Sequence, residues 1–178
     1  SEEILRDLAD TQTPQGIVAV IQKEEVGPPD FSQGKFLFLE DVQDPGNVGT
    51  MIRTADAAGL TGVIVSDKSA DIYSLKTLRS MQGSHFHLPI YRMSSQVLLD
   101  ETKKAAIPVL ATTLSKDSVD YRELPPIENF VLVMGNEGQG ISPLMAESAD
   151  QLVHISMKGQ AESLNVAVAA GILIFHLS

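Results

Sequence analysis

The sequence predicts an α/β domain in which a mostly parallel sheet is flanked by helices. Two observations lead to this class. Short apolar runs rich in β-branched residues alternate with helical stretches along most of the chain, as they do in parallel sheets. In addition, 178 residues that are 43% hydrophobic are enough for one globular domain with a buried core.

The expected strands are short runs bounded by turn residues. Between the first expected strand, Gly16–Gln22, and the second, Lys35–Val42, the run Gly27-Pro28-Pro29-Asp30 cannot continue a helix or a strand. Glu24–Gly34 is therefore predicted to be an exposed loop. The strands cover Gly16–Gln22, Lys35–Val42, Gly62–Ser66, His87–Tyr91, Pro108–Thr113, Phe130–Met134 and Leu152–Met157.

Apolar residues at helical spacing predict a helix over Asn47–Ala58, with Pro45 at a position where a helix can begin. Further helices are expected at Tyr73–Met81 and Ser95–Ala106, and a short one at Ser142–Glu147.

The last helix, Leu164–Leu177, is apolar nearly all round. Such a helix has to be covered on every side, either by the core or by a second subunit. Ser163 is predicted to cap it, which leaves Asn165 as a polar residue in its first turn.

Composition excludes several classes of protein. No apolar run approaches the roughly 20 residues of a membrane span, and no secretory signal is visible near the start. The absence of cysteine excludes disulfides and thiolate metal sites and agrees with a cytoplasmic location. No metal is expected, because the four histidines lack the carboxylate or cysteine spacing of a metal site.

The net charge of −10, taken alone, argues against a nucleic-acid partner. The charge is unevenly distributed along the sequence, however. Between residues 68 and 92 there is one acid, Asp71, and a basic strip of four residues: Lys68, Lys76, Arg79 and Arg92. This basic strip is either a surface that binds RNA or an ordinary solvated helix face.

Three separated segments carry the candidate chemistry. In the first, residues 40–53, a strand ends in a polar turn and a helix then presents Asn47 and Arg53 beside main-chain amides that can bind an anion. The structural alternative makes Asn47 a helix cap and Arg53 a solvent-exposed side chain.

The second segment, residues 131–141, is a buried strand that enters a loop with three glycines. Glycine lets the main chain approach a ligand closely, but the order G-x-x-G-x-G is neither the dinucleotide fingerprint nor a phosphate-binding P-loop. A tight connection with Glu137 exposed is the alternative. In the third segment, a strand is followed by Ser163 and Asn165 at the start of the last helix.

Together, in this order and spacing, the three segments resemble the SpoU/TrmH type of RNA ribose 2′-O-methyltransferases in the SPOUT superfamily. The resemblance runs from Phe36 to the C-terminus. It implies S-adenosylmethionine as cofactor, a C-terminal trefoil knot that holds this cofactor, and a homodimer whose subunits meet near the active sites.

The resemblance also implies the site residues. The catalytic group is expected to be Asn47, Arg53, Glu137, Ser163 and Asn165, and the cofactor residues Thr112, Gly135, Glu137, Ile155, Met157 and Leu164. Arg53, Lys76, Arg79 and Arg92 are expected to contact RNA. Because arginine stays protonated, Arg53 is better suited to bind the phosphate beside the target ribose than to act as a base.

Residues 35–178 are expected to form the catalytic domain, and residues 1–34 a first strand and linker that follow a missing RNA-binding domain. The junction at Thr13-Pro14-Gln15-Gly16 favours rRNA of the 23S type over tRNA as the substrate. Two alternatives stay open: a non-catalytic RNA- or nucleotide-binding module of the same fold, and a nicotinamide-type enzyme, which the glycine order disfavours.

Overall fold

The computed structural model describes residue 4, residues 16–22 and residues 26–178. A seven-stranded sheet with the order β3-β2-β1-β6-β4-β7-β5 runs through the molecule, and all neighbouring strands are parallel. The predicted α/β class is therefore confirmed. The strands are β1 (Lys35–Leu39), β2 (Gly62–Val65), β3 (Ile90–Arg92), β4 (Val109–Thr112), β5 (Val119–Asp120), β6 (Phe130–Met134) and β7 (Gln151–His154).

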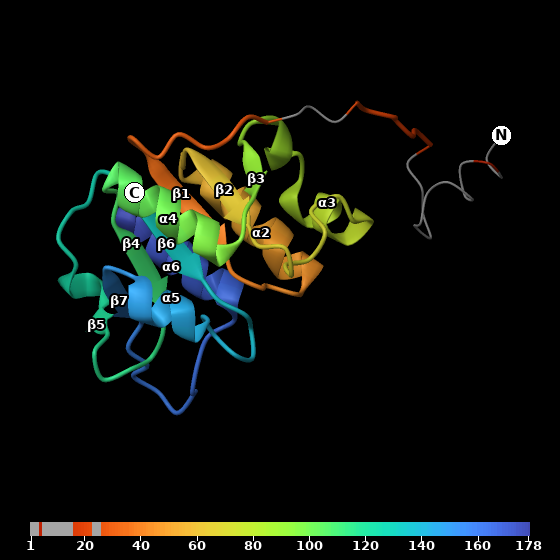
Figure 1. The fold of residues 1–178 in the computed structure, drawn as a ribbon. Coiled ribbons are helices and arrows are strands. Elements are labelled where there is room, and N and C mark those ends of the chain that lie inside the picture. Colours follow the sequence, from red (N-terminus) through yellow and green to blue (C-terminus); the bar gives the residue numbers. More distant parts are fainter. Residues whose placement is uncertain (1–3, 5–15, 23–25) are drawn as a thin grey trace.

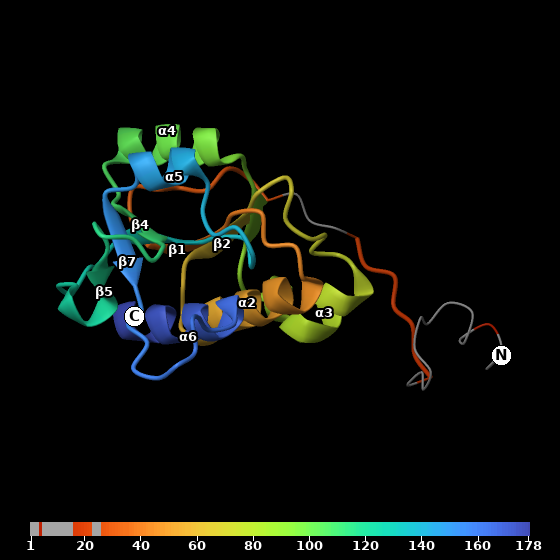
Figure 2. The same cartoon turned by 90° about the horizontal axis from the view of Figure 1, so that it is seen from below.

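Helices cover both faces of the sheet, so that the molecule has three layers (Figures 1 and 2). The helices on one face are α2 (Pro45–Ala57), α3 (Leu75–Met81) and α6 (Val166–Leu177), and those on the other are α4 (Ser95–Ala105) and α5 (Pro143–Ser148). Two short 3-10 turns, η1 (Ser84–Phe86) and η2 (Tyr121–Glu123), complete the regular structure of the described residues.

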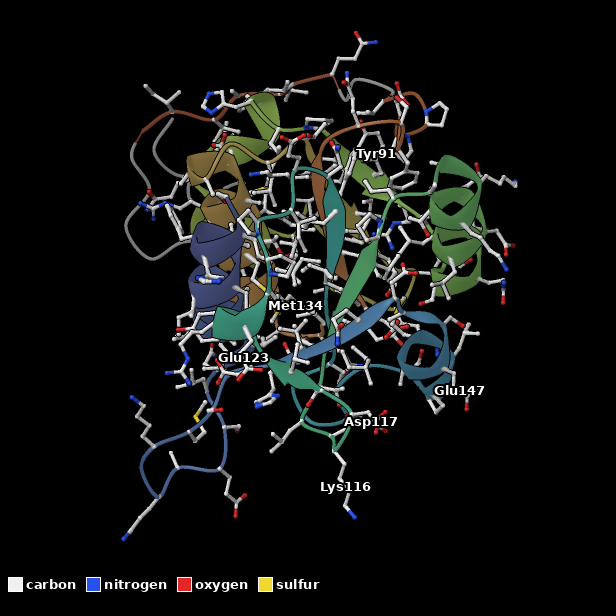
Figure 3. The ribbon with its side chains drawn as sticks, turned by 90° about the vertical axis from the view of Figure 1, so that its left-hand side faces the viewer. Tyr91, Lys116, Asp117, Glu123, Met134 and Glu147 are labelled. Carbon is white, nitrogen blue, oxygen red and sulfur yellow. The ribbon has the colours of Figure 1, made fainter. Side chains whose placement is uncertain are left out.

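Each face of the sheet has its own apolar core. Met134 belongs to the core beneath α2 and α6, whereas Tyr91 packs against the core beneath α4 and α5, and Figure 3 shows the two residues on these opposite sides. The central strands β1 and β6 are buried on both faces, which explains why their sequences, KFLFL and FVLVM, are almost uninterrupted apolar runs.

Two of the predicted strands differ from the structure. Gly16–Gln22 is not a strand: it pairs with no strand of the described chain, and Val20 is 100% exposed. A β-branched run forms a strand only where it finds a neighbour to pack against, which this run lacks. The strand predicted at His87–Tyr91 begins only at Ile90, because the chain before it turns through η1.

Sequence patterns did not indicate β5, which has only two residues and continues directly into η2. The other strands and the helices lie within a few residues of their predicted bounds. The loop before β1 is irregular as expected over its described residues, but Phe31 is buried and packs edge-on against Phe36, with 5.0 Å between the ring centroids.

Helix α6 differs from its prediction in the residue that caps it. Asn165, not Ser163, caps it, because the Asn165 side chain accepts hydrogen bonds from the main-chain nitrogens of Ala167 and Val168. The chain itself covers only one face of the helix. Val168 and Phe175 on the other face are 52% and 61% exposed.

None of the described helices is both long and apolar enough to cross a membrane. The described residues also contain no cluster of three or more His, Cys, Asp or Glu side chains that could hold a metal ion.

Candidate active site

A cavity of about 500 Å³ opens at the carboxyl ends of β4, β6 and β7, next to the start of α6. This is the edge at which parallel α/β sheets place their ligands. Its wall is mostly apolar and includes every residue predicted to bind the cofactor: Thr112, Gly135, Glu137, Ile155, Met157 and Leu164. Ser163 also lies on the wall.

The glycine loop after β6 forms one side of this cavity. Asn136 and Gly140 exchange two main-chain hydrogen bonds of 2.9 Å, so the loop folds back on itself. A Cβ at position 135 would overlap the main chain of Gly140 and Ile141. Glycine is therefore required at position 135 by close approach of the main chain, not by an unusual φ.

A hydrogen-bond network joins the three segments that the sequence singled out. The Glu137 carboxylate accepts a hydrogen bond of 3.0 Å from the side-chain amide of Asn47. The Asn47 side-chain oxygen in turn accepts one of 3.0 Å from the amide of Asn165. The network thus connects the glycine loop, the start of α2 and the start of α6.

Glu137 also fixes the turn before α2, because its carboxylate accepts hydrogen bonds from the main-chain nitrogens of Gln43 (3.1 Å) and Asp44 (3.0 Å). Partial burial by itself raises the pKa of Glu137, but the donors from Asn47, Asp44 and Gln43 outweigh burial, so the pKa lies below its ordinary value of 4.5. The side chain is therefore an anion at neutral pH that is held in one orientation.

Helix α2 is capped by Asp44, whose carboxylate accepts a hydrogen bond of 2.9 Å from the main-chain nitrogen of Asn47. Asn47 is therefore not the cap, which leaves its side chain available to Glu137 and Asn165. Lys76 on α3 donates a hydrogen bond of 2.8 Å to Asp44. The bonds from Lys76 and from the Asn47 main chain lower the pKa of Asp44.

Arg53 lies apart from this network. It is exposed on α2, six residues after Asn47, so it is about 9 Å further along the helix axis and on another side of the helix. Its guanidinium has no hydrogen bond or ion pair with the described residues, and Glu137 contacts Asn47 instead. Within one chain, the structure brings together Asn47, Glu137 and Asn165, but not Arg53.

The basic strip lies beside the same edge of the sheet. Arg92, at the end of β3, donates to the carbonyl oxygens of Ser66 (3.2 Å) and Asp67 (3.4 Å), while Lys68 lies 3.6 Å from the Asp41 carboxylate. Arg79 is exposed on α3. Lys76 and Lys68 are thus paired with acids of the turn that precedes α2.

Sequence reasoning missed two residues that shape this turn. Asp41 has a left-handed backbone with φ 56°, and its carbonyl oxygen accepts a hydrogen bond of 2.8 Å from the Asn136 side chain. The Asn136 side chain also accepts from the amides of Gly138 and Gln139. Asn136 stands beside Glu137 in the glycine loop, but nothing in a single sequence shows a contact across 95 residues.

Known proteins share this fold and this sequence pattern. Residues 34–175 match the SpoU rRNA Methylase family. The 23S rRNA (guanosine(2553)-2′-O)-methyltransferase RlmP of Bacillus subtilis is 46% identical over 177 residues, which cover 99% of this chain and 70% of the relative.

Among solved structures, an AdoMet-bound rRNA methyltransferase from Sinorhizobium meliloti has 42% identity and a TM-score of 0.77, and the match covers 80% of this chain and 55% of the other. A TrmH-family protein from Porphyromonas gingivalis reaches a TM-score of 0.86 at 33% identity, over 95% of this chain and 68% of the other.

The fold and the cavity therefore define an α/β domain of the class of S-adenosylmethionine-dependent RNA methyltransferases. Within this class, the chain belongs to the SpoU rRNA methylase family. The resemblance, the enzyme class and the cofactor predicted from the sequence are confirmed, and the solved relatives imply the knotted SPOUT fold.

Proposed function

We propose that this chain transfers a methyl group from S-adenosylmethionine to a ribose 2′-hydroxyl of rRNA, with 23S-type rRNA as the substrate and the cytoplasm as the location. The observation that carries the proposal is that the cavity formed by the predicted cofactor residues adjoins the Glu137–Asn47–Asn165 network. The name of the Bacillus subtilis relative supports this substrate.

The cavity fits the cofactor. Its volume of about 500 Å³ lies in the range of small-molecule sites, and its wall is mostly apolar with a few polar groups, as such sites require. Gly135 lets the main chain of the loop close against the space, since a side chain there would displace residues 140 and 141. When bound, S-adenosylmethionine supplies the methyl group on its sulfonium.

The reaction needs alignment of the ribose hydroxyl, removal of its proton and control of charge. Arg53 binds the phosphate next to the target ribose and stabilises the developing negative charge, while phosphate or water takes the proton. Glu137 fixes Asn47, and Asn47 and Asn165 orient the ribose. Ser163 contacts the substrate or cofactor from the cavity wall.

Residues 35–178 form the catalytic domain in this proposal, and RNA crosses the edge of the sheet along the basic strip. Lys76, Arg79 and Arg92 bind its phosphates.

The chain acts as a homodimer. Val168 and Phe175 lie seven residues apart, and so at helical spacing, on the uncovered face of α6, and both are more than half exposed. A second subunit that covers this stripe removes apolar surface from water, and brings a second Arg53 near the edge of the sheet.

The association can be tested by light scattering on a sizing column. Phe175→Asp should convert a dimer to a monomer, whereas Val97→Asp, at an exposed apolar residue of α4, should not. A monomeric parent protein would contradict the dimer.

Titration calorimetry with S-adenosylmethionine and with NAD tests which cofactor the protein binds. Binding of NAD alone would overturn the proposal. Mapping of 2′-O-methyl marks on 23S rRNA in cells with and without the gene then identifies the nucleotide. If the protein binds S-adenosylmethionine but no mark depends on it, the non-catalytic module of the same fold becomes the better account.

A further inference from the structure

We propose that Glu40 is a positioning residue that holds the glycine loop, and with it one wall of the cofactor cavity, in register with the turn that carries Asn47. Glu40 does not line the cavity. The inference rests on the proposed function, because it assigns Glu40 an effect on cofactor binding.

Glu40 is a buried acid, only 3% exposed, at the carboxyl end of β1. Its carboxylate accepts hydrogen bonds from the hydroxyls of Ser95 (2.6 Å) and Ser142 (2.8 Å) and from the Ser142 main-chain nitrogen (2.8 Å). Burial of a carboxylate is costly unless such donors are present, so this site is built for a negative charge. The carboxylate also faces the first turn of α4, where the helix dipole favours a negative charge.

The partners of Glu40 mark both ends of the glycine loop. Its main-chain nitrogen donates a hydrogen bond of 2.9 Å to the carbonyl of Met134, directly before Gly135. Its carboxylate binds Ser142, directly after Ile141. One residue of β1 therefore fixes the point where the loop leaves the sheet and the point where it enters α5.

Between these ends, the hydrogen bonds that join the loop to other described segments all go to residues shortly after Glu40 in the sequence. Asn136 donates to the carbonyl of Asp41, and Glu137 accepts from the amides of Gln43 and Asp44. Hydrogen bonds thus join the glycine loop to the turn before α2, and Glu40 is the buried residue from which this turn starts. If Ser142 is released, the main chain at Gly140 can move, and Gly140 lies on the cavity wall.

The test compares Glu40→Gln, Ser142→Ala and Ser95→Ala by titration calorimetry with S-adenosylmethionine, on the whole chain. Ser95 and Ser142 both donate to the same oxygen of Glu40, but only Ser142 adjoins the loop, so Ser95→Ala controls for the loss of one hydrogen bond to Glu40. The Ser142 hydroxyl also caps α5 by accepting from the main-chain nitrogen of Met145, so Ser94→Ala, which removes the cap of α4, controls for the loss of a cap. We expect Glu40→Gln to weaken binding about tenfold, since it breaks hydrogen bonds to a charged group. Ser142→Ala should weaken it several-fold, and Ser95→Ala less than twofold.

Amide hydrogen exchange supplies a second readout. In Glu40→Gln and Ser142→Ala, the amide of Gly140, which donates to the Asn136 carbonyl, should exchange faster, while amides of α4 should not. Lower melting temperatures with unchanged affinity and unchanged exchange at Gly140 would show that Glu40 is only structural, and would overturn the inference.

The outcomes separate the two proposals. If the parent protein does not bind S-adenosylmethionine, the proposed function is wrong and the inference with it. If the parent binds but Ser142→Ala matches Ser95→Ala, only the inference is wrong. A weakening by Ser142→Ala that Ser94→Ala reproduces would also overturn only the inference, so the serine variants decide the question even if Glu40→Gln does not fold.

Discussion

The two halves of the carboxyl edge of the sheet differ in the residues that surround them. Beside β4, β6 and β7, main chain and apolar side chains such as Ile155 and Leu164 line a cavity that opens to solvent. Beside β1, β2 and β3, charged side chains lie on an open surface, where Lys68 and Lys76 are paired with Asp41 and Asp44.

This difference suits two different ligands. A concave, mostly apolar pocket suits a small molecule, whereas a surface with cations suits a polyanion. Glu137, Asn47 and Asn165 stand at the boundary between the halves. Although the chain is acidic overall, its basic strip lies next to acids of the turn before α2, which form ion pairs with Lys68 and Lys76.

The largest expected effect separates transfer from cofactor binding. Arg53→Ala should lower methyl transfer by a factor of about 100 or more, because in the proposed function it removes a charge that acts on the RNA and not on the cofactor. The affinity for S-adenosylmethionine should stay within a few-fold. Single-turnover assays measure the rate of transfer, and calorimetry measures the affinity for the cofactor. Arg53→Lys keeps the charge without the planar guanidinium, so its rate of transfer should lie between those of the parent and of Arg53→Ala. Undiminished turnover by Arg53→Ala would refute the assignment.

The cavity half can be disrupted by one methyl group. Gly135→Ala should weaken S-adenosylmethionine binding at least about tenfold, because the new Cβ overlaps residues 140 and 141 and the loop has to move. Gly138→Ala in the same loop is the control, since its Cβ would meet nothing nearer than the Asn136 side-chain oxygen at 3.7 Å. Equal affinities of the two variants would show that the loop does not shape the cofactor site.

The stability of the protein should depend on pH through Glu137, which lies at the boundary between the two halves. Because the pKa of Glu137 is lowered in the folded protein, its charge contributes stability that is complete above the ordinary pKa of 4.5 and is lost as the pH falls through the lower folded value. The parent should therefore melt at a higher temperature than Glu137→Gln at pH 7, and the difference should shrink below pH 4.5. A difference that is the same at pH 7 and at pH 3 would argue against a role of the charge.

The open half should show the smallest effect. In the proposed function Lys76 contacts one phosphate, so Lys76→Ala should lower RNA affinity a few-fold and make the salt dependence of binding less steep by about one counterion. Stability should change by less than about 1 kcal/mol, because the ion pair with Asp44 is exposed. Lys104→Ala, which breaks an exposed ion pair on α4, serves as the control in filter-binding titrations at several salt concentrations.

Local signals and distant contacts were predictable to different degrees. The strands β1 and β6 could be predicted because each is a continuous apolar run between turn residues, and α2 because its apolar spacing follows Pro45. The strand expected at Gly16–Gln22 failed because β-propensity does not say whether a neighbour is present. Ser163 and Asn165 are both good caps, and only the fold shows that the helix begins after Asn165.

The site followed the same rule. The residues that line the cavity came from a family resemblance, since no single segment was specific. The hydrogen bonds that join Glu137, Asn47 and Asn165 connect residues at least 90 positions apart, and such contacts leave no trace in local pattern.

The bond between Asn47 and Asn165 spans 118 residues of chain. During synthesis the turn, α2 and most of the sheet are therefore made long before the start of α6 leaves the ribosome, and contacts of such long range form late. A growing polypeptide has the basic strip before it has the completed network. The enzyme can thus acquire its charged surface early in translation, and the completed hydrogen-bond network only when the last helix docks.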